Sequence, residues 1–234
     1  MSSTTQTGRR RSSLTLAAAV AVASAGLALA FAGGNAAQGH SEEHADAAKP
    51  RVLTQERLAL HDAMRRLWED HITWTRLFIV SATANLPDTP ATTRRLLRNQ
   101  DDIGDAVKPF YGRAAGERLT TLLREHITTA ADLVLAASAG DQAAVERHSR
   151  AWYRNANQIA DFLSEANPRH WPRREMRSMM REHLDLTLAE AVAHLEGDHR
   201  AEIRTYDLIH RQILEMADML SDGIAAQFPR RFRP

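Results

Sequence analysis

Two histidines and two carboxylates in the last third of the sequence have the types and spacing of metal ligands. His183 and Glu190 are seven residues apart, which is two turns along one helix face, and Asp207 and His210 are three apart. Imidazoles and carboxylates that face each other inside a helical bundle bind zinc, iron, manganese or copper, and their spacing alone does not distinguish these metals. We therefore take these four residues as candidate metal ligands.

A second interpretation of the same residues stays open. Charged side chains on helices are mostly solvated, so Glu190 and Asp207 could simply lie on the surface. If Asp207 faces outward, the set is reduced to His183 and His210, which are too few ligands for a tight site. The metal hypothesis therefore depends on which way these helix faces point.

The segment around His183 belongs to an internal repeat. An acid followed closely by a histidine, with apolar residues on both sides, occurs at 67–75, 122–130 and 179–187. A second phrase follows each of them at 102–107, 158–163 and 215–220, and its last Asp lies 34 or 35 residues after the histidine. The histidines His71, His126 and His183 are separated by 55 and 57 residues. Such a period predicts three copies of one helical unit. It also makes His71 and His126 weaker candidate ligands.

The elements that must position these residues are helices. Apolar residues recur at three- and four-residue steps, no segment alternates with period two, and Pro-rich or Gly-Asp sequences separate the periodic stretches. The predicted fold is all-α, a six-helix bundle built from three tandem antiparallel helical hairpins at about 54–108, 113–165 and 172–227. Gly140 and Gly197 should each end one helix, and the Asp that follows should cap the next.

Distance from the turn predicts which residues lie level within a hairpin. His126 should lie beside Asn155, and His183 should lie beside His210 and Gln212. A histidine bonded to an amide across its own hairpin is also the ordinary way to satisfy a buried imidazole. For the histidines of the first two hairpins, a structural role therefore accounts for the pattern as well as metal binding does.

The ends of the chain differ in composition from its middle. Residues 1–37 have the pattern of a signal peptide, with Arg9, Arg10 and Arg11 before an apolar run at 14–32 and small residues after it. A run of 19 residues is also long enough for an uncleaved membrane anchor. Residues 38–52 are a predicted flexible linker, 53–228 a helical domain and 229–234 a basic tail. We expect an exported protein, secreted or associated with the cell envelope.

Composition and the absence of known motifs exclude several classes of partner and of chemistry. The net charge is +1 and there is no cysteine, which argues against nucleic acid as a partner and excludes disulfides and thiolate chemistry. We find no phosphate-binding glycine loop, nucleophile elbow or His-Glu-x-x-His motif, so the sequence identifies no catalytic residue and favours a protein without enzymatic activity. A membrane contact is expected only through an uncleaved signal segment, and the sequence identifies no protein partner. Two functions remain: an exported metal-binding bundle, or a metal-free extracytoplasmic scaffold or ligand-binding module.

Four phrases carry a resemblance to a known family: WTRLFI at 74–79, NQDDIG at 99–104, KPFYG at 108–112 and MREHLDLT at 180–187. They resemble an uncharacterised family of exported bacterial all-helical proteins, and the likeness covers almost all of the chain after the linker. Some of its members are labelled glycosyltransferase or acetylglutamate kinase, but this sequence has neither the α/β pattern nor the nucleotide-binding motifs that such enzymes need. The resemblance therefore implies an exported helical protein and no mechanism.

Overall fold

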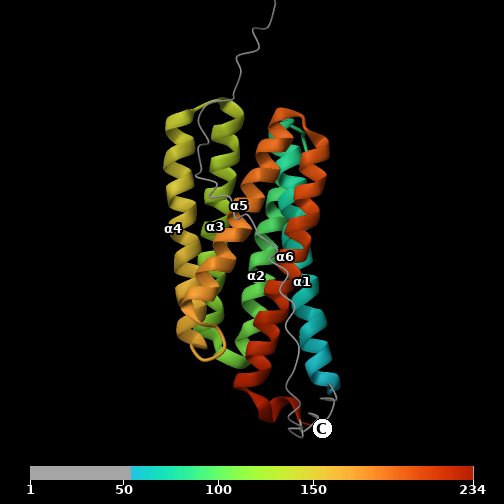
Figure 1. Ribbon diagram of the computed structural model, residues 1–234, viewed down its shortest axis with the longest axis vertical. Helices are drawn as coiled ribbons and strands as arrows, with labels where there is room; N and C mark the ends of the chain where they lie inside the picture. Colours follow the sequence, from blue (N-terminus) through green and yellow to red (C-terminus); the bar gives the residue numbers. More distant parts are fainter. Residues whose placement is uncertain (1–53, 234) are drawn as a thin grey trace, which may run out of the picture. The chain divides into compact units, whose positions relative to one another are not determined.

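A computed structural model describes residues 54–233, which form a closed ring of six helices (Figure 1). The three hairpins are α1 (Gln55–Thr83) with α2 (Thr89–Tyr111), α3 (Arg113–Ala139) with α4 (Gln142–Ala166), and α5 (Arg173–Glu196) with α6 (His199–Gln227). Each helix packs on the next, and α6 returns to pack on α1. The described residues contain no strand. The predicted all-α bundle of three tandem hairpins is confirmed.

The predicted signal peptide and linker lie outside the described residues. Within the described range, no helix is both long and apolar enough to cross a membrane.

The turn chemistry of the second and third hairpins follows the prediction. Gly140 and Gly197 end α3 and α5 with φ of 72° and 75°, a left-handed conformation that glycine adopts without steric cost. Asp141 then accepts a hydrogen bond from the backbone N–H of Ala144 at the start of α4, and Asp198 does the same at the start of α6. Both turns are therefore tight, and each sets the two helices of its hairpin side by side.

Two prolines lie inside a helix that they were expected to flank. Pro90 falls in the first turn of α2, where a residue without an N–H donor is tolerated because those donors have no partner within the helix. Pro109 lies in the last turn, and the helix continues to Tyr111 because the N–H of Gly112 still bonds to the carbonyl of Lys108. The helix is therefore longer at both ends than the proline positions predict.

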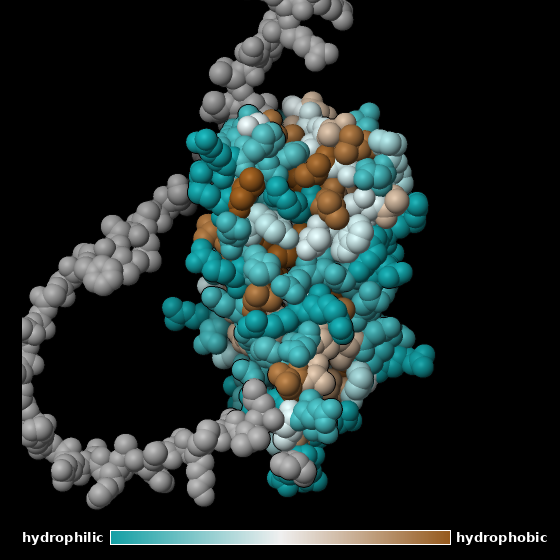
Figure 2. Space-filling view, turned by 90° about the vertical axis from the view of Figure 1, so that its right-hand side faces the viewer, coloured by the Kyte–Doolittle hydropathy of each residue, from teal (hydrophilic) through white to brown (hydrophobic). Residues whose placement is uncertain are grey.

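All six helices contribute apolar side chains to the core, whereas the face shown in Figure 2 is mostly hydrophilic with hydrophobic residues scattered over it. Gly104 on α2 and Gly116 on α3 let these two helices approach closely, since a Cβ on Gly104 would lie 2.8 Å from the carbonyl oxygen of Gly116. The largest fully buried side chains are Trp171, Met64, Leu96, Ile103, Leu122, Ile159, Met176, Leu184, Ile209, Ile213, Met216 and Ile224.

The predicted basic tail begins with a 3₁₀ turn, η1 (Pro229–Phe232), that packs on α1 and α6. Phe232 stacks on Phe110 with ring centroids 6.0 Å apart, and the guanidinium of Arg231 lies 5.4 Å from the centroid of the same ring. Aromatic contact therefore holds this segment against the bundle, although its composition predicts only a solvated tail.

Candidate functional site

The histidines of the three repeats are buried between the helices. His71 on α1, His126 on α3 and His183 on α5 are each less than 5% exposed. The rings of His71 and His183 have their centroids 5.6 Å apart, and the charge of His183 would act on both of the other imidazoles. The repeat thus places three equivalent imidazoles close together in the interior, and we call His71, His126 and His183 the histidine centre.

Each of these imidazoles is hydrogen-bonded through Nδ1 to an amide side chain of the following helix. The Nδ1 of His126 lies 2.9 Å from Oδ1 of Asn155, and that of His183 lies 3.2 Å from Oε1 of Gln212. In the first hairpin, Nε2 of Gln100 lies 3.3 Å from Nδ1 of His71. The predicted pairing of a histidine with an amide is confirmed in the second and third hairpins, and a neighbouring amide takes the role in the first.

The amides fix the register of the hairpins as well. In every hairpin the side-chain NH₂ of an amide donates to the backbone carbonyl four residues before the histidine, at 2.9–3.1 Å. The pairs are Asn99 with Leu67, Asn155 with Leu122, and Gln212 with Met179. The same hydrogen bond in three repeats indicates a structural role for these amides.

The interior keeps all three imidazoles neutral. Burial lowers the pKa of His126 to about 3 and that of His183 to about 4, and it places the pKa of His71 well below its ordinary value. The indole N–H of Trp152 donates to Nε2 of His126 at 3.1 Å, so the proton of that ring must be on Nδ1, where it donates to Asn155. Both nitrogens of His126 are therefore occupied, as expected for a core histidine.

The structure does not bring the four predicted ligands together. His183 lies beside His71 in the interior, whereas Oε1 of Glu190 is 2.6 Å from Nη1 of Arg76 on α1. Nε2 of His210 is 2.9 Å from Oε1 of Glu69, and Asp207 is exposed. Distance from the turn correctly placed Gln212 beside His183, but it did not predict the direction in which α6 presents Asp207 and His210.

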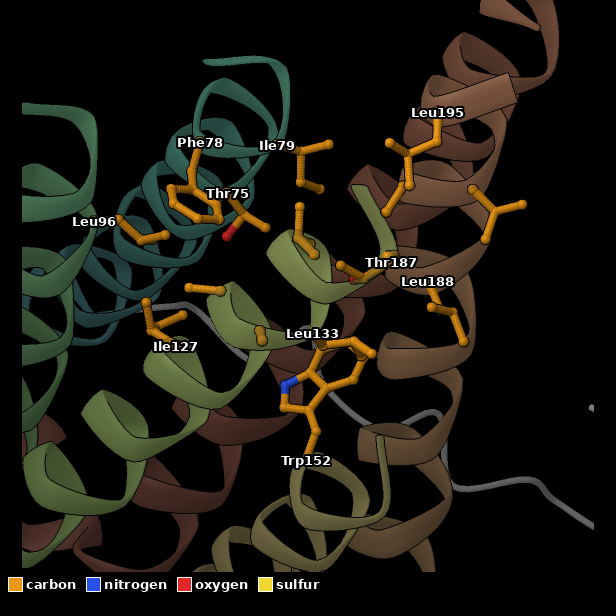
Figure 3. Close-up of a pocket in the computed structure, with 16 residues that line it drawn as sticks. Thr75, Phe78, Ile79, Leu96, Ile127, Leu133, Trp152, Thr187, Leu188 and Leu195 are labelled. Carbon is orange, nitrogen blue, oxygen red and sulfur yellow. The ribbon is translucent and has the colours of Figure 1, made fainter. Parts of the chain in front are cut away.

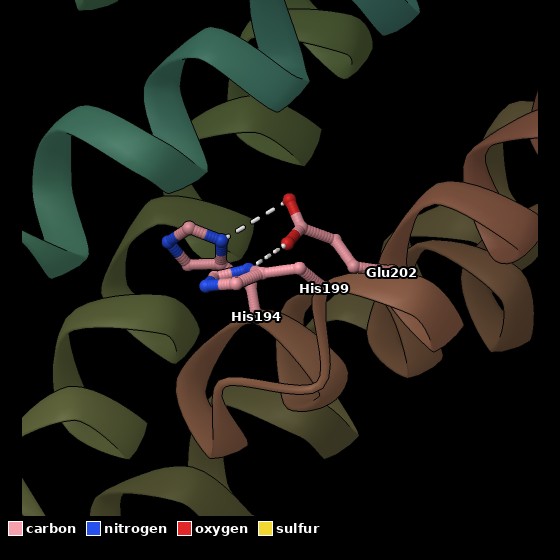
Figure 4. Close-up of side chains that lie close together, drawn as sticks. All are labelled: His194, His199 and Glu202. Carbon is pink, nitrogen blue, oxygen red and sulfur yellow. Dashed lines mark hydrogen bonds and ion pairs between the residues drawn. The ribbon is translucent and has the colours of Figure 1, made fainter.

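A different group in the same hairpin does converge. Nitrogens of His194 and His199 and a carboxylate oxygen of Glu202 all lie within 4.8 Å of one another, and no other set of three or more such ligands does so among residues 54–233 (Figure 4). Nδ1 of His194 is 3.1 Å from Oε1 of Glu202, and Nδ1 of His199 is 2.8 Å from Oε2. The described residues thus include a His/Glu cluster that could hold a metal ion.

The tight turn between α5 and α6 creates this cluster. His194 lies in the last turn of α5, Gly197 reverses the chain, and His199 and Glu202 lie in the first turn of α6. Glu202 is almost fully buried, His194 is 15% exposed and His199 is 70% exposed, so the cluster has a buried side and an open side. The helix dipoles favour this arrangement, because a positive charge is stabilised near the carboxyl end of α5, where His194 lies, and a negative charge near the amino end of α6, where Glu202 lies.

Arg76 holds the buried side of the cluster in place. Its Nη2 lies 2.7 Å from Oε1 of Glu202 while its Nη1 binds Glu190, and its guanidinium lies 5.0 Å from the centroid of the Tyr206 ring. Burial opposes ionisation of Glu202, but the two nearby histidines and the charge of Arg76 outweigh it and keep the pKa below its ordinary value. Burial dominates at Glu190 and raises its pKa to about 7.

One nitrogen of the cluster is not satisfied by protein. Nδ1 of His194 is buried and lies within ion-pair distance of Glu202, but the direction of the approach does not make a hydrogen bond. A buried polar atom without a partner is uncommon and calls for a physical explanation. A metal ion held between the imidazoles and the carboxylate would use the lone pair of this nitrogen.

The sequence contained a signal for this cluster. His194 and His199 are three residues before and two residues after Gly197, and Glu202 follows on the next turn of the helix. The turn itself was predicted, so the same count from the turn would have placed these side chains together. No family model, curated protein or solved structure matches the chain, so the function has to be argued from these residues.

Proposed function

We propose that this protein binds a divalent transition-metal ion at the turn between α5 and α6, through His194, His199 and Glu202. The observation that carries the proposal is the convergence of two imidazole nitrogens and one carboxylate oxygen within 4.8 Å. This donor set suits zinc, copper, iron or manganese better than calcium or magnesium, which prefer oxygen ligands alone. Three protein ligands also leave a coordination position for water.

The neighbours of the cluster support this assignment. Arg76 occupies one oxygen of Glu202 and thereby orients the carboxylate, as residues behind a metal ligand commonly do. The exposed ring of His199 gives the ion access from solvent. The buried side would then hold the site in shape while the open side exchanges the metal.

Metal binding is tested with protein that carries no affinity tag and has been freed of metal by a chelator. Calorimetric titration with zinc, copper, iron and manganese should show one ion per chain and a rise in melting temperature, because a ligand that binds only the folded state stabilises it. The variant His199→Ala should weaken binding at least about tenfold without disturbing the core, because this side chain is mostly exposed.

The matched control is His148→Ala. His148 lies on α4 with a carboxylate of Asp132 at 4.0 Å, so it presents a surface histidine near an acid without a third ligand. Its loss should leave binding unchanged. Equal weakening in both variants, or no gain in stability with any of the four metals, would contradict the proposal and favour the metal-free scaffold or ligand-binding module.

We also propose that the protein is exported and that its signal segment is removed. The support is the order of the first 37 residues: three arginines, a 19-residue apolar run and a small-residue stretch. Mass spectrometry of the exported protein should find an amino terminus near Ala37 or Gln38. Recovery of the intact chain from the membrane fraction would instead indicate an anchor.

A further inference from the structure

An apolar cavity lies between the helices, apart from the metal cluster. Side chains from α1, α3 and α5 surround it, among them Phe78, Ile127 and Leu188 (Figure 3). In this view Trp152 of α4 and Leu195 of α5 lie at opposite ends of the cavity. The empty space exists because α3 and α5 present small side chains here, which are Ala130, Ala131, Ala137 and Ala191.

The cavity is small and partly open to solvent. About 50 Å³ of it is accessible to water, within about 560 Å³ of empty space that includes the opening to solvent. Leu133 and Trp152 are buried, whereas Ala137 and Leu195, near the carboxyl ends of α3 and α5, are half-buried. Other wall residues of these two helices, such as Ala131 and Leu188, are half-buried too, so the cavity is closed at Trp152 and opens along α3 and α5. Well-packed interiors have few spaces larger than a water molecule, so this cavity is unusual.

The wall offers a ligand no free hydrogen-bond donor. Its polar groups are two threonine hydroxyls and one indole, and all three are occupied. Thr75 donates to the carbonyl of His71 and Thr187 to that of His183, both at 2.8 Å, and the indole of Trp152 donates to His126. The lining has no charged or titratable side chain. Water would find no partners in such a space, and a polar ligand would lose its hydration without compensation.

We propose that this cavity binds the unbranched alkyl chain of an amphiphile, with the polar head left at the opening. The accessible space of about 50 Å³ is too small for a ring but takes the end of a straight chain, and the rest of the chain can lie along the open side of the cavity. A head group outside needs no partner in the wall. Burying each methylene contributes about 0.8 kcal/mol, so a chain of several carbons would bind without any polar contact. The proposal is independent of the metal cluster.

The test measures binding of decanol by calorimetry and by tryptophan fluorescence, since Trp152 closes the inner end. One molecule per chain should bind, with a negative change in heat capacity as apolar surface is buried. Cyclohexylmethanol should bind at least about tenfold more weakly, because the accessible space is too small for a ring. Decanoate should match decanol within about threefold, because the wall holds the chain and not the head. A chelator should leave decanol binding unchanged, which separates this proposal from the metal site.

Three variants make the test specific. Ala131→Leu fills the cavity and should weaken decanol binding at least about tenfold, whereas Ala143→Leu, an exposed position on α4 away from the wall, should not change it. Leu133→Ala enlarges the cavity and should preserve or strengthen binding, a result that damage to the fold would not produce. Circular dichroism confirms that each variant is folded. Absence of saturable binding, or equal affinity in wild type and Ala131→Leu, would overturn the proposal.

Discussion

At the scale of single residues, Arg76 joins parts of the chain that are far apart in sequence. It binds Glu190 and Glu202, so a side chain of the first hairpin pairs with two carboxylates of the third. Glu190 is only 3% exposed, and a buried carboxylate without its cation is strongly destabilising. Counting residues within one hairpin could not have revealed this link, because the partner comes from outside the hairpin.

We expect Arg76→Met to lower the free energy of unfolding by about 3–5 kcal/mol, because it leaves Glu190 buried without a partner. The double variant Arg76→Met with Glu190→Gln should recover part of this loss, since the amide carries no charge. Urea denaturation at pH 8 measures both. Arg150→Met is the control, because Arg150 pairs with Glu146 at an exposed position and should lose no more than about 1 kcal/mol. Similar losses of unfolding free energy in the two arginine variants would show that the buried ion pair stabilises the fold no more than the exposed one.

At the scale of helices and turns, the sequence predicted the repeat, the six helices and the level of the histidines. Periodicity and turn residues report where a helix begins and ends and which residues share a height. They do not report the rotation of a helix about its axis against its neighbours. Asp207 and His210 were expected to line the inside of the third hairpin, but α6 presents Asp207 to solvent and His210 to Glu69. The ring order, in which α6 packs on α1, determines that rotation.

The turn between α5 and α6 should matter for metal binding as well as for stability. Gly197→Ala places a side chain at φ of 75°, which costs about 1–2 kcal/mol and should shift His199 relative to His194. Gly140→Ala imposes the same strain at the equivalent turn between α3 and α4, away from the cluster. Both variants should lose similar stability in thermal denaturation, but only Gly197→Ala should weaken metal binding in calorimetry. Equal metal affinity in the two variants would show that the turn does not position the ligands.

At the scale of the whole bundle, the buried histidines should make stability depend on pH. Their pKa values are lowered in the folded state, so below about pH 6.5 the unfolded chain binds protons that the folded chain does not. Stability is therefore lost as pH falls from about 6.5 toward 4, at about 1.4 kcal/mol per pH unit for each histidine. Glu190 opposes this trend: its pKa is raised to about 7, so its own contribution favours the folded state at lower pH.

Because three histidines outweigh one glutamate, the net change should be a loss of stability in acid. Urea denaturation between pH 7.5 and 4.5 measures the slope. Replacing His183 with Gln should reduce that slope whatever it does to stability at pH 7.5, whereas His170→Gln, outside the histidine centre, should not change it. A profile that is flat over this range, or one that rises toward acid, would contradict the assigned neutral state of the imidazoles.

The return of α6 to α1 has a consequence for the order of the hairpins along the chain. The last described segment, η1, packs against α1, and Arg57 near the start of α1 lies 2.7 Å from Asp222 near the end of α6. The packing of the six helices therefore does not depend on which helix comes first along the chain. A circular permutant that joins residues 54 and 233 by a flexible linker and opens the chain between Gly140 and Asp141 should fold to the same helical content by circular dichroism. Its histidine centre and its α5–α6 turn would then be assembled by a chain that starts at the second half of the second hairpin.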